Sequence, residues 1–223
     1  KKLLVTLNKI MFSSENKMIV ADALARVDGI MDRRPLEESG LEEQPKDHSI
    51  IFERVSFRYE DAAKDALHQI KLKIGEGEHV AFVGPSGGGK TTLASLIARF
   101  FDVTEGAVKI GGVDVRDIPS KELLEQVSFV FQDSKLLKMS IYDNVRMGKK
   151  DASREEVMEA LKNAQCEDII EKLPDGMDTI IGTKGTYVSG GEAQRLSIAR
   201  AMLKNAPILI LDERSEEHTS ELQ

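Results

Sequence analysis

The chain has 223 residues, of which 41% are hydrophobic and 31% are charged, and its formal net charge is −7. This composition is typical of a soluble globular domain, and the acidic balance argues against a nucleic-acid binder, which usually carries a basic excess. A single cysteine, Cys166, excludes an internal disulfide, and no apolar run is long enough to cross a bilayer. The chain begins at Lys1 rather than at methionine and shows no signal peptide, so we expect its N-terminus to be a cut.

The first 49 residues differ from the rest of the chain in residue pattern. Residues 1–31 carry apolar side chains at helical spacing, which predicts a helix whose apolar stripe needs a partner. Residues 32–49 are acidic, poor in apolar residues and contain two prolines, which predicts a linker.

Five segments after the linker have the pattern of β-strands. Residues 50–59 and 66–74 alternate polar and apolar side chains, as half-buried antiparallel strands do. Residues 79–84 (HVAFVG), 127–132 (VSFVFQ) and 207–213 (PILILDE) are short and largely apolar. Such runs are typical of strands buried inside a parallel sheet.

Helices are expected between these strands. They cover about 90–101, most of 140–187, and 189–204, and a hairpin is expected to turn at Gly111–Gly112. Strands that alternate with helices predict an α/β domain with a mainly parallel sheet.

A glycine-rich stretch, GPSGGGKTT, lies between a predicted strand and a predicted helix and matches G-x-x-x-x-G-K-S/T. Its glycines let backbone N–H groups curl around phosphate oxygens, and the helix N-terminus adds unpaired donors. Lys90 supplies positive charge for the β- and γ-phosphates, and the Thr91 hydroxyl is placed to bind Mg²⁺. The residues expected to bind the nucleotide are Gly84, Pro85, Ser86, Gly87, Gly88, Gly89, Lys90, Thr91 and Thr92. The alternative is a glycine-rich turn in an unrelated α/β protein.

Two carboxylates, Asp212 and Glu213, follow the last predicted strand. Phosphoryl transfer depends on positioning and charge neutralisation, so a phosphate-binding ATPase needs acids at the end of a neighbouring strand. We assign Asp212 to the Mg²⁺ ion, and Glu213 to orienting or deprotonating the attacking water as the catalytic residue. The alternative is a strand that simply ends in polar residues at the surface.

A third motif, YVSGGEAQRLSIARA at 187–201, places Ser189, Gly190 and Gly191 at the start of a predicted helix, which is a second anion-ready terminus. One chain cannot easily wrap both glycine-rich turns around the same phosphate. A head-to-tail pair of chains can, with each nucleotide between the Lys90 loop of one chain and the Ser189 turn of the other. The alternative is an ordinary helix cap.

Together these motifs resemble the ATP-binding cassette (ABC) family over about residues 50–213. The resemblance implies a P-loop NTPase fold with a mainly parallel core sheet, an N-terminal antiparallel β subdomain and a helical subdomain at about 136–190. It implies ATP and Mg²⁺ as ligands and hydrolysis assisted by Glu213. Tyr59 lies where the family has an adenine-stacking aromatic residue, and Gln132 lies where it has a glutamine that contacts Mg²⁺ and relays to the membrane domain.

The third motif departs from the family pattern. VSGGE replaces the usual LSGGQ, so Val188 and Glu192 differ, and Glu192 is expected to place a carboxylate near the partner's nucleotide. Thr183 stands where the family usually has a glutamate in the loop that contacts coupling helices. The resemblance implies nucleotide contacts from Tyr59, Gln132, Ser189, Gly190, Gly191 and Glu192, and metal contacts from Thr91, Gln132 and Asp212.

Further segments, 140–148 and 173–192, resemble fused exporter-type transporters, and 21–32 resembles the end of the last transmembrane-domain helix. This implies that residues 1–31 end a membrane domain, the alternative being a free-standing amphipathic helix. It also implies two partners, the chain's own transmembrane domain and a second cassette, and a place at the cytoplasmic face of the cell membrane. Two other functions stay open: a soluble ABC ATPase of the DNA-repair or translation type, and a regulatory half that binds ATP without hydrolysis.

The family pattern stops after Glu213. Residues 214–223, RSEEHTSELQ, match the translation of a common sequencing adapter, so we expect this tail to be non-native. We therefore expect the C-terminal part of the cassette to be missing. The 223-residue chain is expected to have little or no ATPase activity, whereas its full-length parent is expected to hydrolyse ATP.

Overall fold

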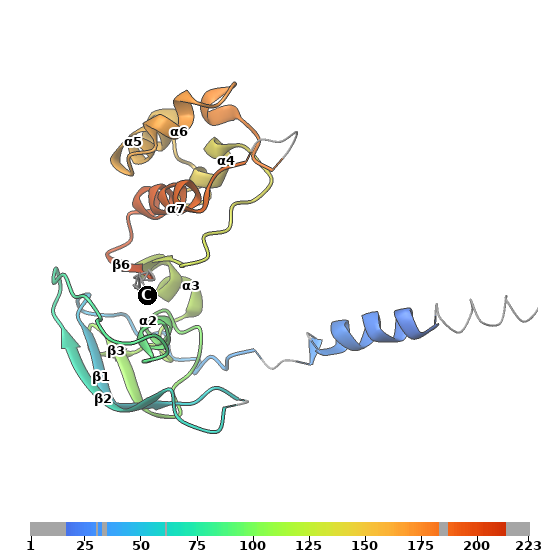
Figure 1. Cartoon of the computed structure of the whole chain (residues 1–223). Coiled ribbons are helices and arrows are strands. Elements are labelled where there is room, and N and C mark those ends of the chain that lie inside the picture. Colours follow the sequence, from blue (N-terminus) through green and yellow to red (C-terminus); the bar gives the residue numbers. More distant parts are fainter. Residues whose placement is uncertain (1–16, 30, 33–34, 61, 183–186, 213–223) are drawn as a thin grey trace, which may run out of the picture. The chain divides into compact units, whose positions relative to one another are not determined.

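The computed structural model describes residues 17–29, 31–32, 35–60, 62–182 and 187–212. The chain divides into two compact units, Lys1–Glu37 and Glu38–Gln223 (Figure 1).

In the first unit, residues 17–29 form a helix on which the apolar side chains of Met18, Leu24 and Val27 are exposed. The predicted helix is thus confirmed over this stretch, and residues 1–16 lie outside the described part of the chain. Among the described residues, none of the helices combines the length and the apolar content that a membrane span requires.

The second unit begins with an antiparallel sheet whose strand order is β2-β1-β3-β4 (Figure 1). The strands are β1 (Ile50–Phe57), β2 (Leu67–Ile74), β3 (Glu105–Ile110) and β4 (Val113–Asp114). Ile50 lies opposite both Ile74 and Ile110, and one face of the sheet buries Phe52 and Val55 in an apolar cluster shared with α2. The predicted antiparallel strands and the hairpin at Gly111–Gly112 are confirmed.

A separate parallel pair is formed by β5 (Val127–Val130) and β6 (Ile208–Leu211). The predicted third strand, residues 79–84, is wrong: this segment has no regular structure, and Val83 is 93% exposed. Within the described residues β6 pairs only with β5, and residues 79–84 form no ladder with either strand, so their backbone lacks the hydrogen bonds that define a strand.

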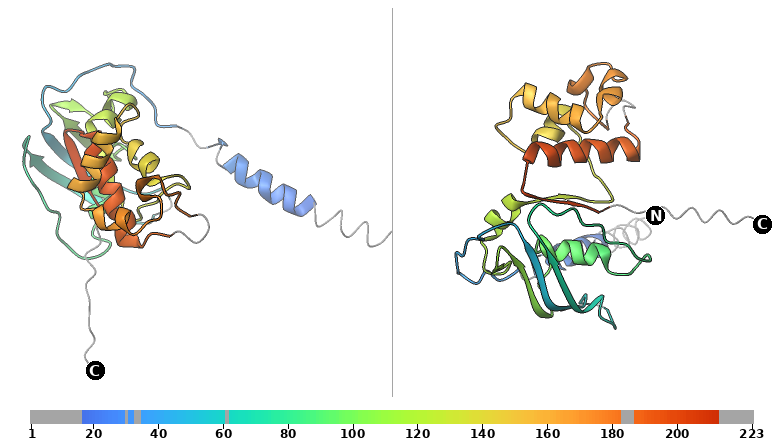
Figure 2. Two further views of the ribbon diagram at one scale, coloured as in Figure 1. Left: turned by 90° about the horizontal axis from the view of Figure 1, so that it is seen from above. Right: turned by 90° about the vertical axis from the view of Figure 1, so that its left-hand side faces the viewer.

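The helices form two groups, with α2 against the antiparallel sheet and α4 to α7 packed together (Figure 1). They are α2 (Lys90–Ile97), α3 (Ser120–Gln126), α4 (Ile141–Arg146), α5 (Arg154–Asn163), α6 (Glu167–Glu171), the 3₁₀ turn η1 (Gly176–Asp178) and α7 (Gly190–Lys204). The long helix α7 packs against α4 and α5, and these helices share a second apolar cluster that contains Leu161 and Leu196 (Figure 2). The prediction did not include α3, and the helix expected at 90–101 ends at Ile97.

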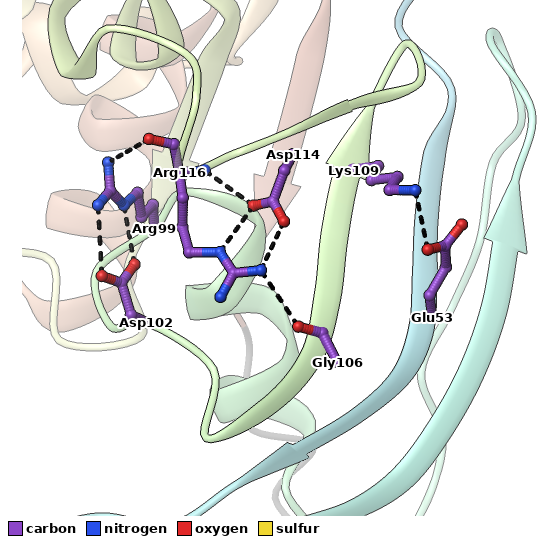
Figure 3. A network of polar contacts seen from close by, with 7 residues as sticks. All are labelled: Glu53, Arg99, Asp102, Gly106, Lys109, Asp114 and Arg116. Atoms are coloured by element: carbon purple, nitrogen blue, oxygen red, sulfur yellow. Dashed lines mark hydrogen bonds and ion pairs between the residues drawn. The ribbon is translucent and has the colours of Figure 1, made fainter. Parts of the chain in front are cut away.

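A polar network holds the end of α2 against the β3–β4 hairpin (Figure 3). The buried Arg99 donates from Nε to Asp102, at 2.8 Å, and from Nη1 to the carbonyl of Arg116. Arg116 in turn donates to both carboxylate oxygens of Asp114, at 3.0 and 2.6 Å, and to the carbonyl of Gly106. Because Asp114 lies in β4, this network connects the residues just after α2 to the β3–β4 hairpin.

Candidate functional site

The glycine-rich loop enters α2 through Gly89, which has φ of 84° and acts as the helix N-cap. A Cβ atom at Gly89 would lie 2.8 Å from the carbonyl oxygen of Ala66 and 2.8 Å from Leu67 Cδ2, so no other residue fits without displacement. No side chain caps this helix, and its first backbone N–H groups are therefore open to an external acceptor.

Lys90, the first residue of α2, folds back over the loop. Its Nζ donates to the carbonyl oxygens of Gly84, at 2.7 Å, and Pro85, at 2.9 Å. These bonds hold the ammonium group beside the backbone that the sequence predicts to bind phosphate. The cation and the open N–H groups of α2 are thus presented by one short segment.

Thr91 and Asp212 are joined although 121 positions separate them. Thr91 Oγ1 donates to Asp212 Oδ1 at 2.8 Å, while the backbone N–H of Asp212 continues the β5–β6 pairing by donating to the Val130 carbonyl. A hydroxyl and a carboxylate are hard oxygen ligands that Mg²⁺ prefers. No group of three or more His, Cys, Asp or Glu able to hold a metal occurs among the described residues. Glu213 lies outside the described residues.

Tyr59 lies beside the start of α2. Its hydroxyl is 2.9 Å from Thr92 Oγ1, and its ring packs edge-on against Phe57 and Phe101. The residue remains 38% exposed, so part of its surface is accessible to a planar ligand. The structure therefore places Tyr59 beside the phosphate-loop helix through contacts that the sequence pattern does not reveal, and its stacking on adenine stays a prediction.

Gln132 is exposed just beyond the end of β5. Val130 of β5 and Leu211 of β6 are register partners, and the two strands are parallel. Gln132 and Asp212 therefore follow strands that end at the same edge, where ligands of open α/β sheets bind.

Ser189 and Glu192 cap the N-terminus of α7 reciprocally. Ser189 Oγ accepts from the backbone N–H of Glu192 at 3.3 Å, and Glu192 Oε2 accepts from the backbone N–H of Ser189 at 2.7 Å. This second bond lowers the pKa of Glu192, and Lys172 Nζ lies 3.9 Å from the same carboxylate. The carboxylate is thus turned back onto its own helix. A Cβ atom added at Gly190 or Gly191 would meet no other atom within 4 Å, so the outer surface of this turn is open.

Two polar residues of the helical cluster were not predicted from the sequence. Asn144 of α4 is fully buried and accepts a bond from Arg200 of α7. The signal in the sequence was weak: an asparagine inside a short helix, between Asp143 and Val145. Thr183, whose identity departs from the family pattern, lies outside the described residues.

A groove of about 390 Å³ lies between β5 and α7. Phe129 and Phe131 form one part of its lining, Met147 another, and Arg200 and Lys204 contribute cationic groups. Phe131 is 50% exposed, so the groove presents an aromatic surface beside Gln132.

Comparison with known proteins gives a consistent result. The family described as ABC transporter matches residues 67–216. YgaD of Bacillus subtilis (strain 168), an ATP-binding/permease protein named for multidrug export, is 49% identical over 164 residues, which are 74% of this chain and 28% of that protein. The ATP-dependent lipid A-core flippase of Syntrophus aciditrophicus (strain SB) is 45% identical over 201 residues, 89% of this chain and 33% of the flippase.

A solved structure of a bacterial Atm1-family ABC exporter with ATP bound is also similar. It superposes with a TM-score of 0.76 at 37% identity, over 84% of this chain and 33% of the exporter chain. The chain therefore spans about a third of the length of the relatives that it matches.

Proposed function

Because the chain belongs to the ABC transporter family, we propose that it is the nucleotide-binding domain of an exporter whose full-length form binds and hydrolyses ATP to drive transport. The observation that carries this proposal is the contact between Thr91 and Asp212, which unites the phosphate loop with the acidic strand end. Similarity to proteins named for multidrug export and for lipid flipping supports the class of exporter and leaves the substrate open.

In this proposal, the phosphate loop binds the triphosphate. The open N–H groups at the start of α2 donate to phosphate oxygens, and Lys90 exchanges its bonds to Gly84 and Pro85 for bonds to the β- and γ-phosphates. Tyr59 stacks on the adenine ring through its exposed face.

The residues at the ends of β5 and β6 would hold the metal. Thr91, Asp212 and Gln132 would bind Mg²⁺, which would supply positive charge for the phosphates. Glu213, which directly follows Asp212, orients the attacking water and accepts its proton.

Two partners complete the proposed machine. A second cassette would present its Ser189 turn to the nucleotide held by Lys90, and the open surface of Gly190 and Gly191 allows that approach. The transmembrane domain would be the other partner, with this chain at the cytoplasmic face of the membrane. We propose residues 1–31 as the end of that domain, 32–49 as linker, 50–213 as the cassette with its helical subdomain at about 136–190, and 214–223 as a non-native tail.

Calorimetry with MgATP tests the first step on the 223-residue chain. Lys90→Ala should lower the affinity by about a hundredfold, because the phosphates lose their main cation. Lys162→Ala, which removes an exposed lysine from α5, should leave the affinity unchanged. An unmodified chain that does not bind MgATP, or equal affinity in the Lys90 variant, would refute the proposal.

The hydrolytic step needs the complete transporter that contains this cassette. There, Glu213→Gln should retain MgATP binding and nearly abolish turnover, since the amide cannot accept the proton of the attacking water. Unchanged turnover in that variant would remove Glu213 from the catalytic role.

A further inference from the structure

Asn144 ties down the loop that follows Gln132. Its Oδ1 accepts from the backbone N–H of Leu137 at 2.9 Å, and its Nδ2 donates to the carbonyls of Leu137, at 3.0 Å, and Ser140, at 2.9 Å. The side chain is fully buried, so these bonds do not compete with water. The side-chain amide of Asn144 therefore satisfies backbone groups of this irregular loop that have no strand partner.

Arg200 of α7 holds Asn144 in turn. It donates from Nε to the Asn144 carbonyl at 2.8 Å and from Nη2 to Asn144 Oδ1 at 3.3 Å. Burial lowers the pKa of Arg200, and within the described residues this arginine forms no ion pair with a carboxylate. The guanidinium is partly buried and uses its donors on a neutral amide and a carbonyl, and these bonds connect α7 to α4.

Gly148, just after α4, brings the same two elements into backbone contact. A Cβ atom at Gly148 would lie 2.3 Å from the carbonyl oxygen of Arg200. Its φ is not positive, so glycine is required here by this close approach and not by backbone conformation. The loop after Gln132 is thus connected to α7 by side-chain bonds and by direct packing.

The helix α7 carries this connection to the Ser189 turn. It runs without a break from Gly190 to Lys204, so Arg200 lies about 16 Å along the axis from Ser189. Its far end is held on β5 by Lys204, whose Nζ donates to the Val127 carbonyl at 2.7 Å. Because Ser189 lies at the end of α7 remote from this anchor, a tilt of α7 about the anchor would displace Ser189 most.

We propose that Asn144, Arg200 and Gly148 are positioning residues that make the loop after Gln132 and the Ser189 turn move as one body. This inference rests on the proposed function: the state of the nucleotide at Gln132 in one cassette sets how Ser189 meets the nucleotide of the other. None of the three positioning residues contacts the nucleotide itself in this scheme.

Hydrogen exchange followed by NMR on the 223-residue chain tests the physical link. Arg200→Lys keeps the positive charge but removes the guanidinium that donates from two nitrogens to Asn144. It should accelerate exchange of the Leu137 amide by about tenfold or more while the amides of α5 keep their protection. The matched control is Arg195→Lys, on the same helix, whose side chain bonds to Gln165 and Asp168 and should leave Leu137 unaffected.

Two results in this experiment would overturn the proposal. Unchanged exchange at Leu137 in Arg200→Lys would show that Arg200 does not hold the loop. Equal loss of protection at Leu137 and throughout α5 would show that Arg200 is a general stability element. A wild-type chain that does not bind MgATP would instead refute the proposed function, and the exchange result would stand separately.

The complete transporter supplies the functional readout. Arg200→Lys should lower ATP turnover by about tenfold at unchanged MgATP affinity, because nucleotide is bound normally and Ser189 is misplaced. Arg195→Lys should leave turnover near the wild-type value. A parallel loss of affinity and turnover in Arg200→Lys, or an equal loss in the control, would contradict a positioning role.

Discussion

Two glycine-rich helix starts in this chain are built in opposite ways. At α2 the N-cap is Gly89, in the left-handed region and without a capping side chain; at α7 it is Ser189, in extended conformation and capped reciprocally by Glu192. The Gly89 position is crowded by Ala66 and Leu67, whereas Gly190 has open space around it. The start of α2 leaves its backbone N–H groups unpaired and available to a ligand that the loop binds. At the start of α7, side chains of the same helix already cap the backbone, and the surface beside Gly190 is open to a partner molecule.

The largest expected difference between the two starts is steric. Gly89→Ala should cost about 2–4 kcal/mol of unfolding free energy, because the new Cβ meets a carbonyl at 2.8 Å in a strained conformation, and MgATP binding should be lost. Gly190→Ala should change stability by no more than about 1 kcal/mol and should retain MgATP binding. Urea unfolding and calorimetry measure both, and similar effects at the two sites would contradict the comparison.

Removing the Asp212 carboxylate, which contacts Thr91 at the start of α2, should weaken the binding of Mg²⁺ selectively. Asp212→Asn can still accept the bond from Thr91 but loses the charge that favours Mg²⁺. We expect the affinity for MgATP to fall by about tenfold and the affinity for ATP in the presence of EDTA to stay constant. Calorimetry with and without Mg²⁺ checks this, and an equal fall in both conditions would place Asp212 in a structural role.

Removing an N-terminal serine side chain should lower stability mainly at α7, where Ser189 is the N-cap. Ser189→Ala should destabilise the chain by about 1 kcal/mol, because the backbone N–H of Glu192 loses its acceptor. The matched change at the first start is Ser86→Ala, in the loop before α2. It should have a smaller effect, because no side chain caps α2. Thermal unfolding of the two variants compares them directly; a larger effect at Ser86 would reverse the assignment.

The smallest effect concerns pH. The Ser189 N–H lowers the pKa of Glu192 from its ordinary value of 4.5. The resulting stability is present above pH 4.5 and is lost as the pH falls through the lower folded-state pKa. Glu192→Gln keeps the cap but does not titrate, so the difference in melting temperature between wild type and variant should shrink or change sign below pH 4.5. A constant difference from about pH 3 to pH 7 would contradict this interpretation, given the range over which carboxyl groups titrate.

Prediction from sequence succeeded where one segment carries its own signal and failed where a segment depends on a neighbour. The strand β6 and the helix α7 formed as expected because apolar content and an N-cap act locally. Residues 79–84 also form a largely apolar run, yet they are irregular and no described strand pairs with them. The end of α2 at Ile97 reflects Arg99, which takes positive φ and is held by Asp102.

By itself, the sequence determined the order of the motifs, the identity of the phosphate loop and the class of protein, because glycine spacing and helix starts depend on residues a few positions apart. Only the tertiary structure decided that Thr91 meets Asp212, that Glu192 turns back to Ser189, and that Arg200 holds Asn144. Such pairings depend on which strands and helices become neighbours, and that is settled by burial of apolar faces over the whole domain.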